Sequence, residues 1–189
     1  GVYYFNLQKN NQCPTTSNSA GPATGRTYIV GDSISTGLHS IKFEDQLTTV
    51  TSGSTSINHD TGRSITKPGT EVKTSGLQAI ENDKEQIKGA QNIVVILGTN
   101  PENGFEQNLK TMMGNLKNIN PGAQYYWVDI GATRSDLATT WSGYNQIIYN
   151  NAASQGYTVI SRYKALFGQD KDPLNIDAGL KIPGSGDNV

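Results

Sequence analysis

A serine that could act as a nucleophile lies early in the sequence, in the run Gly31-Asp32-Ser33. The run follows an apolar, β-branched stretch that predicts a strand over residues 27–31, and it precedes a predicted helix over residues 36–47. A hydroxyl between a strand and a helix start lies where unpaired backbone N–H groups concentrate partial positive charge. Such a serine can attack a carbonyl carbon beside groups that stabilise the product, or it can simply cap the helix.

Two further loops carry groups that can bind a negatively charged oxygen. Gly62 follows a predicted strand over residues 56–60, where a glycine either makes a plain turn or brings its backbone N–H close to a ligand. Asn100 follows the clearest strand of the chain, residues 92–98. Its side-chain amide can donate to an oxyanion, cap a helix or make a turn. Each residue alone is a weak signal, but their positions after successive strands favour one shared site.

Strands alternate with helices along the rest of the chain. Further helices are predicted over residues 71–88, 102–119 and 135–153, and further strands over residues 124–130 and 157–161. This alternation is typical of a parallel sheet covered by helices on both faces. In such sheets ligands bind at the carboxyl ends of the strands, which is where the serine, the glycine and the asparagine lie.

On these residues the sequence resembles the SGNH/GDSL hydrolases, a family of esterases, lipases and acyltransferases. The resemblance extends from residue 27 to the C-terminus and rests on the Gly-Asp-Ser block, the glycine after the second strand and the Gly-x-Asn block. It implies an α/β fold, a three-layer flavodoxin-like domain with a central five-stranded parallel sheet. It also implies that Ser33 is the nucleophile, and that the Ser33 and Gly62 N–H groups and the Asn100 amide form an oxyanion hole. Pro101 departs from the aspartate that often follows this asparagine.

The family pattern includes a C-terminal Asp-x-x-His block, in which the histidine is the general base and the aspartate orients it. Asp187 fits the position of this catalytic acid, and we expect the histidine directly after Val189. The rival segment over residues 177–181 has Lys181 in the place of the base. A lysine is protonated near neutral pH, so it cannot accept the serine proton. Without a base, only a small fraction of the activity would be left.

The two histidines of the chain fit the role of base less well. His39 lies six residues after Ser33, about a turn and a half into the predicted helix, which indicates a surface or packing residue. His59 flanks the loop that contains Gly62 and is followed by Asp60. It is the alternative base, although Asp60 or solvent can equally satisfy its ring.

Length and composition narrow the classes of partner. The 189 residues predict one hydrolase-like domain over residues 26–189, after an N-terminal segment and linker over residues 1–25. The net charge is −1 and the Lys and Arg residues do not cluster, which argues against nucleic acid as a partner. No apolar run is long enough to span a membrane. The single cysteine, Cys13, cannot form a disulfide within the chain.

The Ser, Thr, Pro and Gly composition of residues 11–25 is typical of a flexible linker. We therefore expect an extracellular or cell-envelope protein tethered by an upstream segment. The expected reaction is hydrolysis of a small-molecule or glycan ester through an acyl-enzyme, with short acyl groups such as acetyl on glycans or small lipids, and no metal or cofactor is implied. Two alternatives stay open: acyl transfer to a surface sugar on the same scaffold, and a binding module that kept the fold and lost the base.

Overall fold

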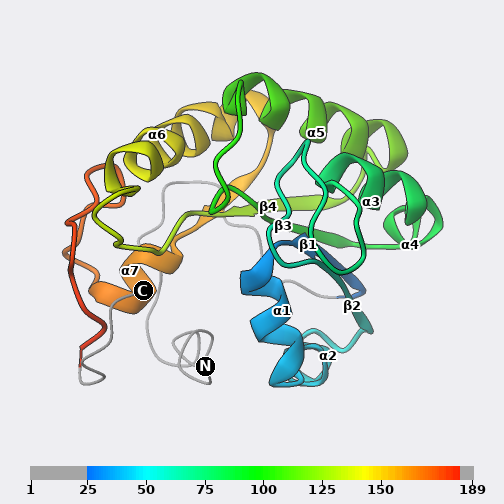
Figure 1. Ribbon diagram of the computed structural model, residues 1–189. Helices are drawn as coiled ribbons and strands as arrows, with labels where there is room; N and C mark the ends of the chain where they lie inside the picture. The colour runs from blue at the N-terminus through cyan, green and yellow to red at the C-terminus, as the bar shows by residue number, and fades with distance from the viewer. Residues whose placement is uncertain (1–24, 184–189) are drawn as a thin grey trace.

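The computed structural model describes residues 25–183, and its centre is one sheet of five parallel strands (Figure 1). The strands are β1 (Thr27–Gly31), β2 (Thr55–His59), β3 (Asn92–Ile96), β4 (Gln124–Val128) and β5 (Thr158–Ile160). They lie in the order β2-β1-β3-β4-β5, and every neighbouring pair is parallel. This order is the flavodoxin-like one, so the predicted three-layer α/β domain with a central five-stranded parallel sheet is confirmed.

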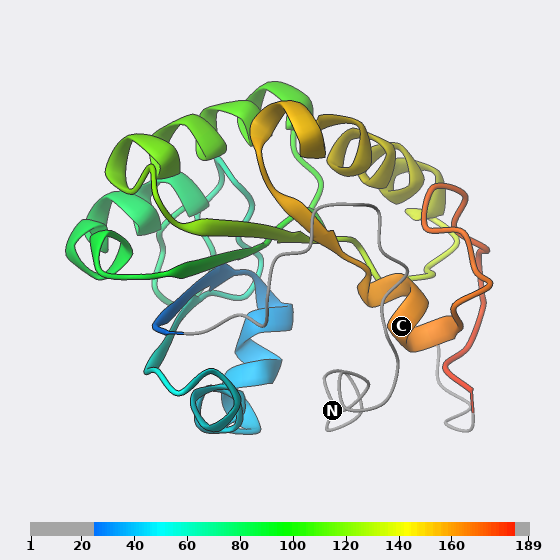
Figure 2. The ribbon, with the colours of Figure 1, turned by 180° about the vertical axis from the view of Figure 1, so that it is seen from behind.

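Helices cover both faces of the sheet (Figures 1 and 2). One face carries α3 (Gly76–Asn82), α4 (Lys84–Lys88), α5 (Phe105–Ile119) and α6 (Ala138–Gln155). The opposite face carries α1 (Ser33–Ser40), α2 (Phe43–Thr51) and α7 (Arg162–Phe167). None of the helices within the described residues is long and apolar enough to cross a membrane.

The two faces hold separate apolar cores, because successive side chains of a strand point to opposite faces. The larger core packs Tyr28 and Trp127 of the sheet against Leu109 and Met112 of α5. The smaller core packs alternate residues of the same strands against α1 and α2; its buried members are Ile29, Leu38, Phe43, Ile96 and Val128. A third cluster of buried residues, which includes Ile130, Trp141 and Tyr163, lies beyond the end of β4 between α6 and α7.

The helix predicted over residues 36–47 has the wrong bounds. It begins at Ser33 because the Asp32 carboxylate caps it, accepting a hydrogen bond of 2.9 Å from the Ile34 N–H. It ends at Ser40, and Lys42, with φ 55°, turns the chain into α2. Ser33 is therefore the first residue of a helix, and not part of a loop before one.

The helix predicted over residues 71–88 is also wrong in its first part. Residues 60–75 form a loop, and α3 begins only at Gly76, behind Ser75 and Gln78, which form a capping box. α4 follows after Asp83. The short helix α7 has no counterpart among the predicted elements, whereas the bounds of the other predicted elements agree within three residues.

Candidate active site

Three loops leave the sheet at one edge. Gly31, the last residue of β1, is in register with His59 at the end of β2 and with Ile96 at the end of β3. The residue after Gly31 continues the pairing, since the Asp32 N–H donates to the Ile96 carbonyl at 3.2 Å. The segments that carry Ser33, Gly62 and Asn100 therefore start side by side at the carboxyl edge of the sheet, as the sequence predicts.

Ser33 stands at the N-terminus of α1 and is half-buried. The interpretation of Ser33 as the helix cap is wrong, because Asp32 provides the capping oxygen. The Ser33 hydroxyl therefore does not cap the helix. N–H groups in the first turn of a helix have no acceptor within the helix, so they can donate to a negatively charged ligand.

Burial raises the pKa of Asp32 to about 6, although the Ile34 N–H and the positive charge of Arg162 both act to lower it. Its side chain is completely buried next to the proposed nucleophile. At neutral pH the carboxylate form prevails, which is the form that accepts the capping hydrogen bond. The fold therefore holds a negative charge beside Ser33, and mild acid removes this charge by protonating Asp32.

Gly62 lies in the loop after β2 with φ +79°, in the left-handed region. A Cβ atom at this position would meet only the Thr70 side chain, at an ordinary distance of 3.6 Å. The requirement for glycine is thus one of backbone conformation and not of space. The turn at Gly62 sets the direction of its N–H, which is the property that an oxyanion donor needs.

Asn100 crosses from the loop after β3 to the loop after β2. Its Nδ2 donates to the carbonyl of Arg63, the residue after Gly62, at 2.9 Å. The preceding residue is held from α6, where Trp141 Nε1 donates to the Thr99 carbonyl at 2.9 Å. A primary amide has two N–H groups, so the bond to Arg63 leaves Asn100 a second donor.

The same two loops are joined a second time by Glu102, which is buried. Its carboxylate accepts hydrogen bonds from the Ile65 N–H at 2.8 Å and from the Thr66 N–H at 3.2 Å. The loop after β3 is therefore joined to the loop after β2 at Arg63 and again at Ile65 and Thr66. These bonds bring Asn100 to the residue after Gly62.

Arg63 lies at the centre of these contacts, and nothing in the sequence predicts this. Its guanidinium is fully buried and donates to the carbonyls of Gly31, Asn58 and Thr74, to Asn58 Oδ1 and to Thr74 Oγ1, at distances between 2.7 and 3.2 Å. Burial lowers the pKa of Arg63, and the negative charge of Asp60 opposes that effect. An arginine in a polar loop gives no sign in the sequence that it will be buried, since arginines are mostly exposed.

Asp60 closes the other side of the same loop. Its carboxylate accepts the N–H groups of Glu71 at 2.9 Å and of Lys73 at 2.8 Å. Burial by itself raises the pKa of Asp60, but these backbone hydrogen bonds more than offset it, so the pKa lies below its usual value. Of the two alternatives for the His59 ring, Asp60 or solvent, the Asp60 carboxylate is engaged with the backbone of its own loop.

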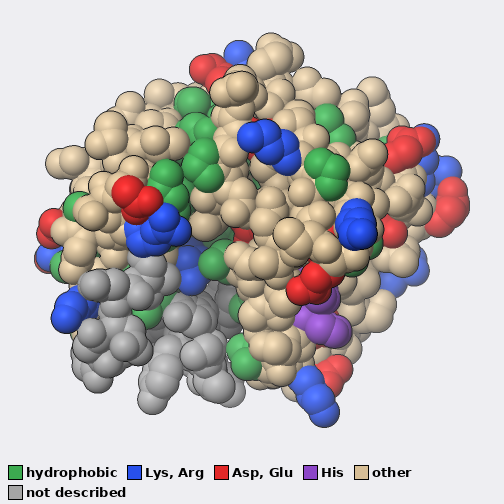
Figure 3. All heavy atoms as spheres, in the orientation of Figure 1, with side chains coloured by type: hydrophobic (Ala, Val, Ile, Leu, Met, Phe, Trp, Pro, Cys, Tyr) green, Lys and Arg blue, Asp and Glu red, His purple; other side chains and the backbone are tan. Residues whose placement is uncertain are grey.

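The two histidines form a pair at the surface beside α1 (Figure 3). Their rings stack with centroids 4.7 Å apart, and His59 Nδ1 lies 3.0 Å from Thr36 Oγ1. His39 is exposed and pairs with Glu44, which confirms its interpretation as a surface or packing residue. Burial and the neighbouring His39 lower the pKa of His59. Within the described residues, the contacts of His59 are with Thr36 and His39, further along α1 than Ser33, so the geometry gives no support to its use as the base.

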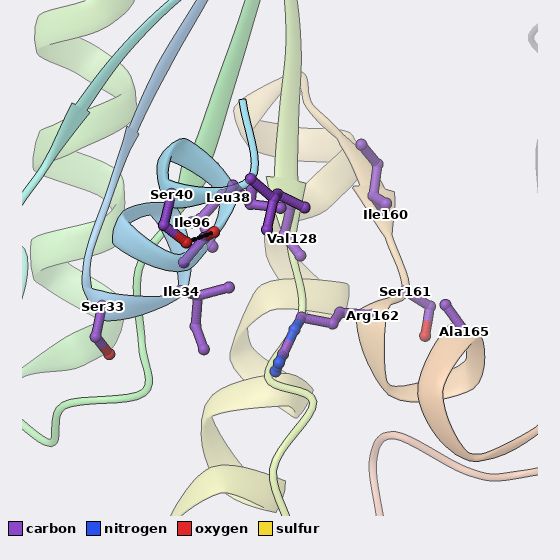
Figure 4. A pocket seen from close by; sticks show the side chains of 12 residues that line it. Ser33, Ile34, Leu38, Ser40, Ile96, Val128, Ile160, Ser161, Arg162 and Ala165 are labelled. Carbon is purple, nitrogen blue, oxygen red and sulfur yellow. Dashed lines mark hydrogen bonds between the residues drawn. The ribbon is translucent and has the colours of Figure 1, made fainter. Parts of the chain in front are cut away.

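A cavity of about 340 Å³ lies between α1 and α7, and Ser33 is at its edge (Figure 4). The lining is mostly apolar and includes Ile34, Leu38, Ile96, Val128 and Ile160. Two polar residues of the lining are engaged elsewhere: Ser161 Oγ donates to Asp129 at 2.7 Å, and Arg162 donates to the Gly131 carbonyl at 2.7 Å. The cavity therefore offers an apolar surface next to the proposed nucleophile.

Some of the predicted features lie outside the described residues, namely Asp187, Cys13 and residues 1–24 of the predicted linker. Among residues 25–183, no three His, Cys, Asp or Glu side chains cluster as a metal site would require. The part of the site that the structure describes thus consists of the Ser33 turn, the loop around Gly62 and the loop around Asn100.

Solved structures share this fold at low sequence identity, although no protein-family model and no curated protein sequence matches the chain. A carbohydrate esterase family 2 enzyme with a carbohydrate-binding domain, from Corynascus thermopiles (Myceliophthora fergusii), is 11% identical with a TM-score of 0.55; the likeness covers 87% of this chain and 62% of that one. TesA is 15% identical with a TM-score of 0.55, covering 82% of this chain and 89% of that one. A protein of Parabacteroides merdae named as a GDSL-like lipase is 9% identical with a TM-score of 0.50, covering 71% and 76%.

This chain thus spans less than two thirds of the length of the first of these structures. The likeness concerns the arrangement of strands and helices and does not extend to individual residues. Together with the sheet order and the positions of the three loops, it shows that the chain has the fold of the SGNH/GDSL hydrolases.

Proposed function

We propose that the chain is a carboxylic ester hydrolase that works through an acyl-enzyme on Ser33. The observation that carries the proposal is the hydrogen bond from Asn100 to the residue after Gly62, at the edge of the sheet where Ser33 begins α1. This bond joins the loop of Asn100 to the turn at Gly62, and both loops leave the sheet beside the half-buried Ser33. Esterases and lipases among the solved structures of the same fold support ester hydrolysis as the reaction.

In the proposed reaction, Ser33 Oγ attacks the carbonyl carbon of an ester and its proton passes to a histidine. The negative oxygen of the tetrahedral intermediate accepts hydrogen bonds from the Ser33 and Gly62 N–H groups and from the Asn100 amide. The C–O bond to the alcohol breaks, and the histidine gives the proton to the leaving oxygen. Water then attacks the acyl-enzyme while the same histidine takes a proton from it. The bond from the acyl carbon to Ser33 Oγ breaks, the histidine returns the proton to Oγ, and the carboxylic acid is released. Asp187 is proposed to orient this histidine, which we place directly after Val189.

The proposed substrates carry short acyl groups, such as acetyl, on glycans or small lipids. One of the solved structures with this fold is a carbohydrate esterase, which supports the glycan. The apolar cavity at the edge of Ser33 supports an acyl group on that side of the nucleophile. A position outside the cell or in the cell envelope, tethered by an upstream segment, belongs to the same proposal.

The test uses the 189-residue chain with one histidine appended after Val189, which completes the Asp-x-x-His spacing. Hydrolysis of 4-nitrophenyl acetate is followed for this protein and for its Ser33→Ala variant. The chain without the added residue is assayed with and without imidazole, an external base. We expect Ser33→Ala to lower kcat/KM by about 10³-fold or more. Because imidazole alone cleaves 4-nitrophenyl acetate, we expect a rate above that of imidazole without protein only when Ser33 is present.

Equal hydrolysis by the two proteins would show that Ser33 is not the nucleophile. If neither the appended histidine nor imidazole produced a rate that depends on Ser33, the binding-module alternative would stand in place of the enzyme. Formation of a sugar ester in the presence of an acceptor sugar would instead favour the acyltransferase alternative.

A further inference from the structure

Arg63 is the residue that contacts all three loops of the proposed site. Its Nη1 donates to the Gly31 carbonyl at 3.2 Å, two residues before Ser33. Its own carbonyl accepts the Asn100 amide at 2.9 Å, and its backbone N–H follows directly on Gly62. One buried side chain and its peptide group therefore join the nucleophile turn to both proposed oxyanion donors.

The guanidinium is held from several sides. Nη1 also donates to the Asn58 carbonyl at 3.2 Å and to Asn58 Oδ1 at 3.0 Å, at the end of β2. Nε and Nη2 donate to Thr74, to its carbonyl at 2.8 Å and its hydroxyl at 2.7 Å, where the loop returns to α3. The planar group can satisfy these acceptors together because its donors point outward in a fixed fork.

The loop that contains Gly62 is fixed at its far side as well. The Asp60 carboxylate binds the Glu71 and Lys73 N–H groups, and the Thr70 N–H donates to the Thr61 carbonyl at 2.9 Å. Gly69 packs against the Asp60 side chain so closely that a Cβ atom would lie 2.2 Å from Asp60 Cγ. With its outer part closed in this way, the loop is held relative to β1 by the side chain of Arg63 and relative to the loop after β3 by the bonds from Asn100 and Glu102.

A buried charge costs stability unless it is fully paired, and the same loop could be closed by apolar packing. Arg63 is 0% exposed, so it does not touch a substrate. Its position is explained if the geometry of the loop matters more than its stability. Electrostatic stabilisation of an oxyanion requires donors placed to within a fraction of an ångström.

We propose that Arg63 is a positioning residue that sets the separation between Ser33, the Gly62 N–H and the Asn100 amide. The proposal rests on the proposed function, since it assigns the oxyanion hole of that reaction a buried support. A lysine in this place keeps the positive charge, but its single ammonium group cannot reach Gly31, Asn58 and Thr74 together. Arg63→Lys should therefore preserve the charge and lose the geometry.

The test compares Arg63→Lys with Asn120→Ala in the chain with the appended histidine. Asn120 is a matched control, because its half-buried amide joins the Ile87 and Ala90 carbonyls, at 2.8 Å each, at the opposite edge of the sheet. Rates are normalised to the folded fraction measured by circular dichroism. We expect Arg63→Lys to lower kcat by about 10- to 100-fold, less than the 10²- to 10³-fold typical for removal of an oxyanion donor itself, while KM changes little. Asn120→Ala should lower the unfolding temperature and leave kcat unchanged.

A double-mutant cycle with Asn100→Ala separates positioning from general destabilisation. If Arg63 acts through the Asn100 amide, the double variant should lose much less than the product of the two single losses. If Arg63→Lys fails to fold, Thr74→Val removes one acceptor of the guanidinium and should lower kcat to a smaller extent.

A kcat of Arg63→Lys equal to that of the parent, or losses that multiply in the cycle, would overturn the proposal while leaving the esterase function intact. In the event that Arg63→Lys does not fold, an unchanged kcat of Thr74→Val would overturn it. A rate that does not depend on Ser33 would instead remove the proposed function itself. The two failures are therefore distinguishable in the same set of proteins.

Discussion

The carboxyl and amino edges of the sheet differ in whether their charged side chains are buried or exposed. Among residues 25–183, the five buried charged residues all follow the end of a strand: Asp32, Asp60, Arg63, Glu102 and Asp129. The charged pairs near the amino edge, in contrast, lie on the surface of α3 and α4, where Glu81 pairs with Lys84 and Glu85 pairs with Lys88. Surface pairs of this kind contribute little to stability, whereas buried charges destabilise the fold unless their partners are complete.

Two connections at the carboxyl edge are also longer than the connections into β3, β4 and β5 at the amino edge. The chain enters β3, β4 and β5 at the amino edge through residues 89–91, 120–123 and 156–157. After β2 and β3 at the carboxyl edge it runs through residues 60–75 and 97–104. Long loops held by buried charges do not help to form a sheet. The amino edge therefore has the short connections that a sheet needs, whereas the carboxyl edge carries the long, internally bonded loops on which the proposed site depends.

The largest contrast is expected between two amides, one at each edge. Asn100→Ala removes a proposed oxyanion donor together with the hydrogen bond to Arg63, so kcat should fall by about 10²- to 10³-fold, or about 3 to 4 kcal/mol of transition-state stabilisation. Asn120→Ala should leave kcat unchanged. Steady-state kinetics on 4-nitrophenyl acetate measures both. Similar losses of kcat in the two variants would remove the functional distinction between the edges.

A smaller effect is expected from the titration of Asp32. Its pKa of about 6 in the folded protein lies above the ordinary value of 3.8, so the folded state binds the proton more tightly than the unfolded state. The protonated Asp32 carboxyl therefore adds on the order of 3 kcal/mol to the free energy of unfolding. This contribution is fully present below about pH 4 and is lost as the pH rises through about 6.

Urea unfolding between pH 4 and pH 7 measures this effect. The free energy of unfolding of the parent should fall with rising pH relative to Asp32→Asn, which cannot titrate at this position. Parallel curves for the two proteins would mean that the Asp32 carboxyl has an ordinary pKa. The ionised Asp32 carboxylate would then not lower the free energy of unfolding.

The smallest effect is expected at the surface of α3. Glu81→Gln removes a pair between exposed side chains and should change the free energy of unfolding by at most about 0.5 kcal/mol. The change should also be smaller in high salt, because salt screens exposed charges. A loss of several kcal/mol in the same urea titration would mean that the amino-edge charges are as structural as those at the carboxyl edge.

The strands and their parallel arrangement could be predicted from the sequence, because apolar runs such as Ile93–Ile96 mark buried strands directly. The start of α1 could not be placed, since the cap is provided by Asp32, inside the motif that suggested the nucleophile. The acidic and lysine residues from Glu71 onward fit a helix equally well. The segment is a loop because the Asp60 carboxylate takes two of its N–H groups.

The residues of the candidate site also differ in how far the sequence predicts their positions. The positions of Ser33, Gly62 and Asn100 at the carboxyl edge of the sheet could be predicted, because each follows a strand. Their roles in the reaction stay a prediction. The position of Arg63 could not be predicted, because its burial depends on the carbonyls of Gly31 and Thr74, which are distant in sequence and become acceptors only after the loop has folded. Local patterns indicate which residues reach the edge of the sheet, and tertiary hydrogen bonds decide how they are held there.

The most direct test of the account is to identify which side chain becomes covalently modified. The chain with the appended histidine is treated with a fluorophosphonate, which phosphonylates an activated serine, and the modified peptide is located by mass spectrometry. The account predicts one adduct, on Ser33, and none in Ser33→Ala. An adduct on another residue, or ester hydrolysis that persists without modification of Ser33, would contradict it.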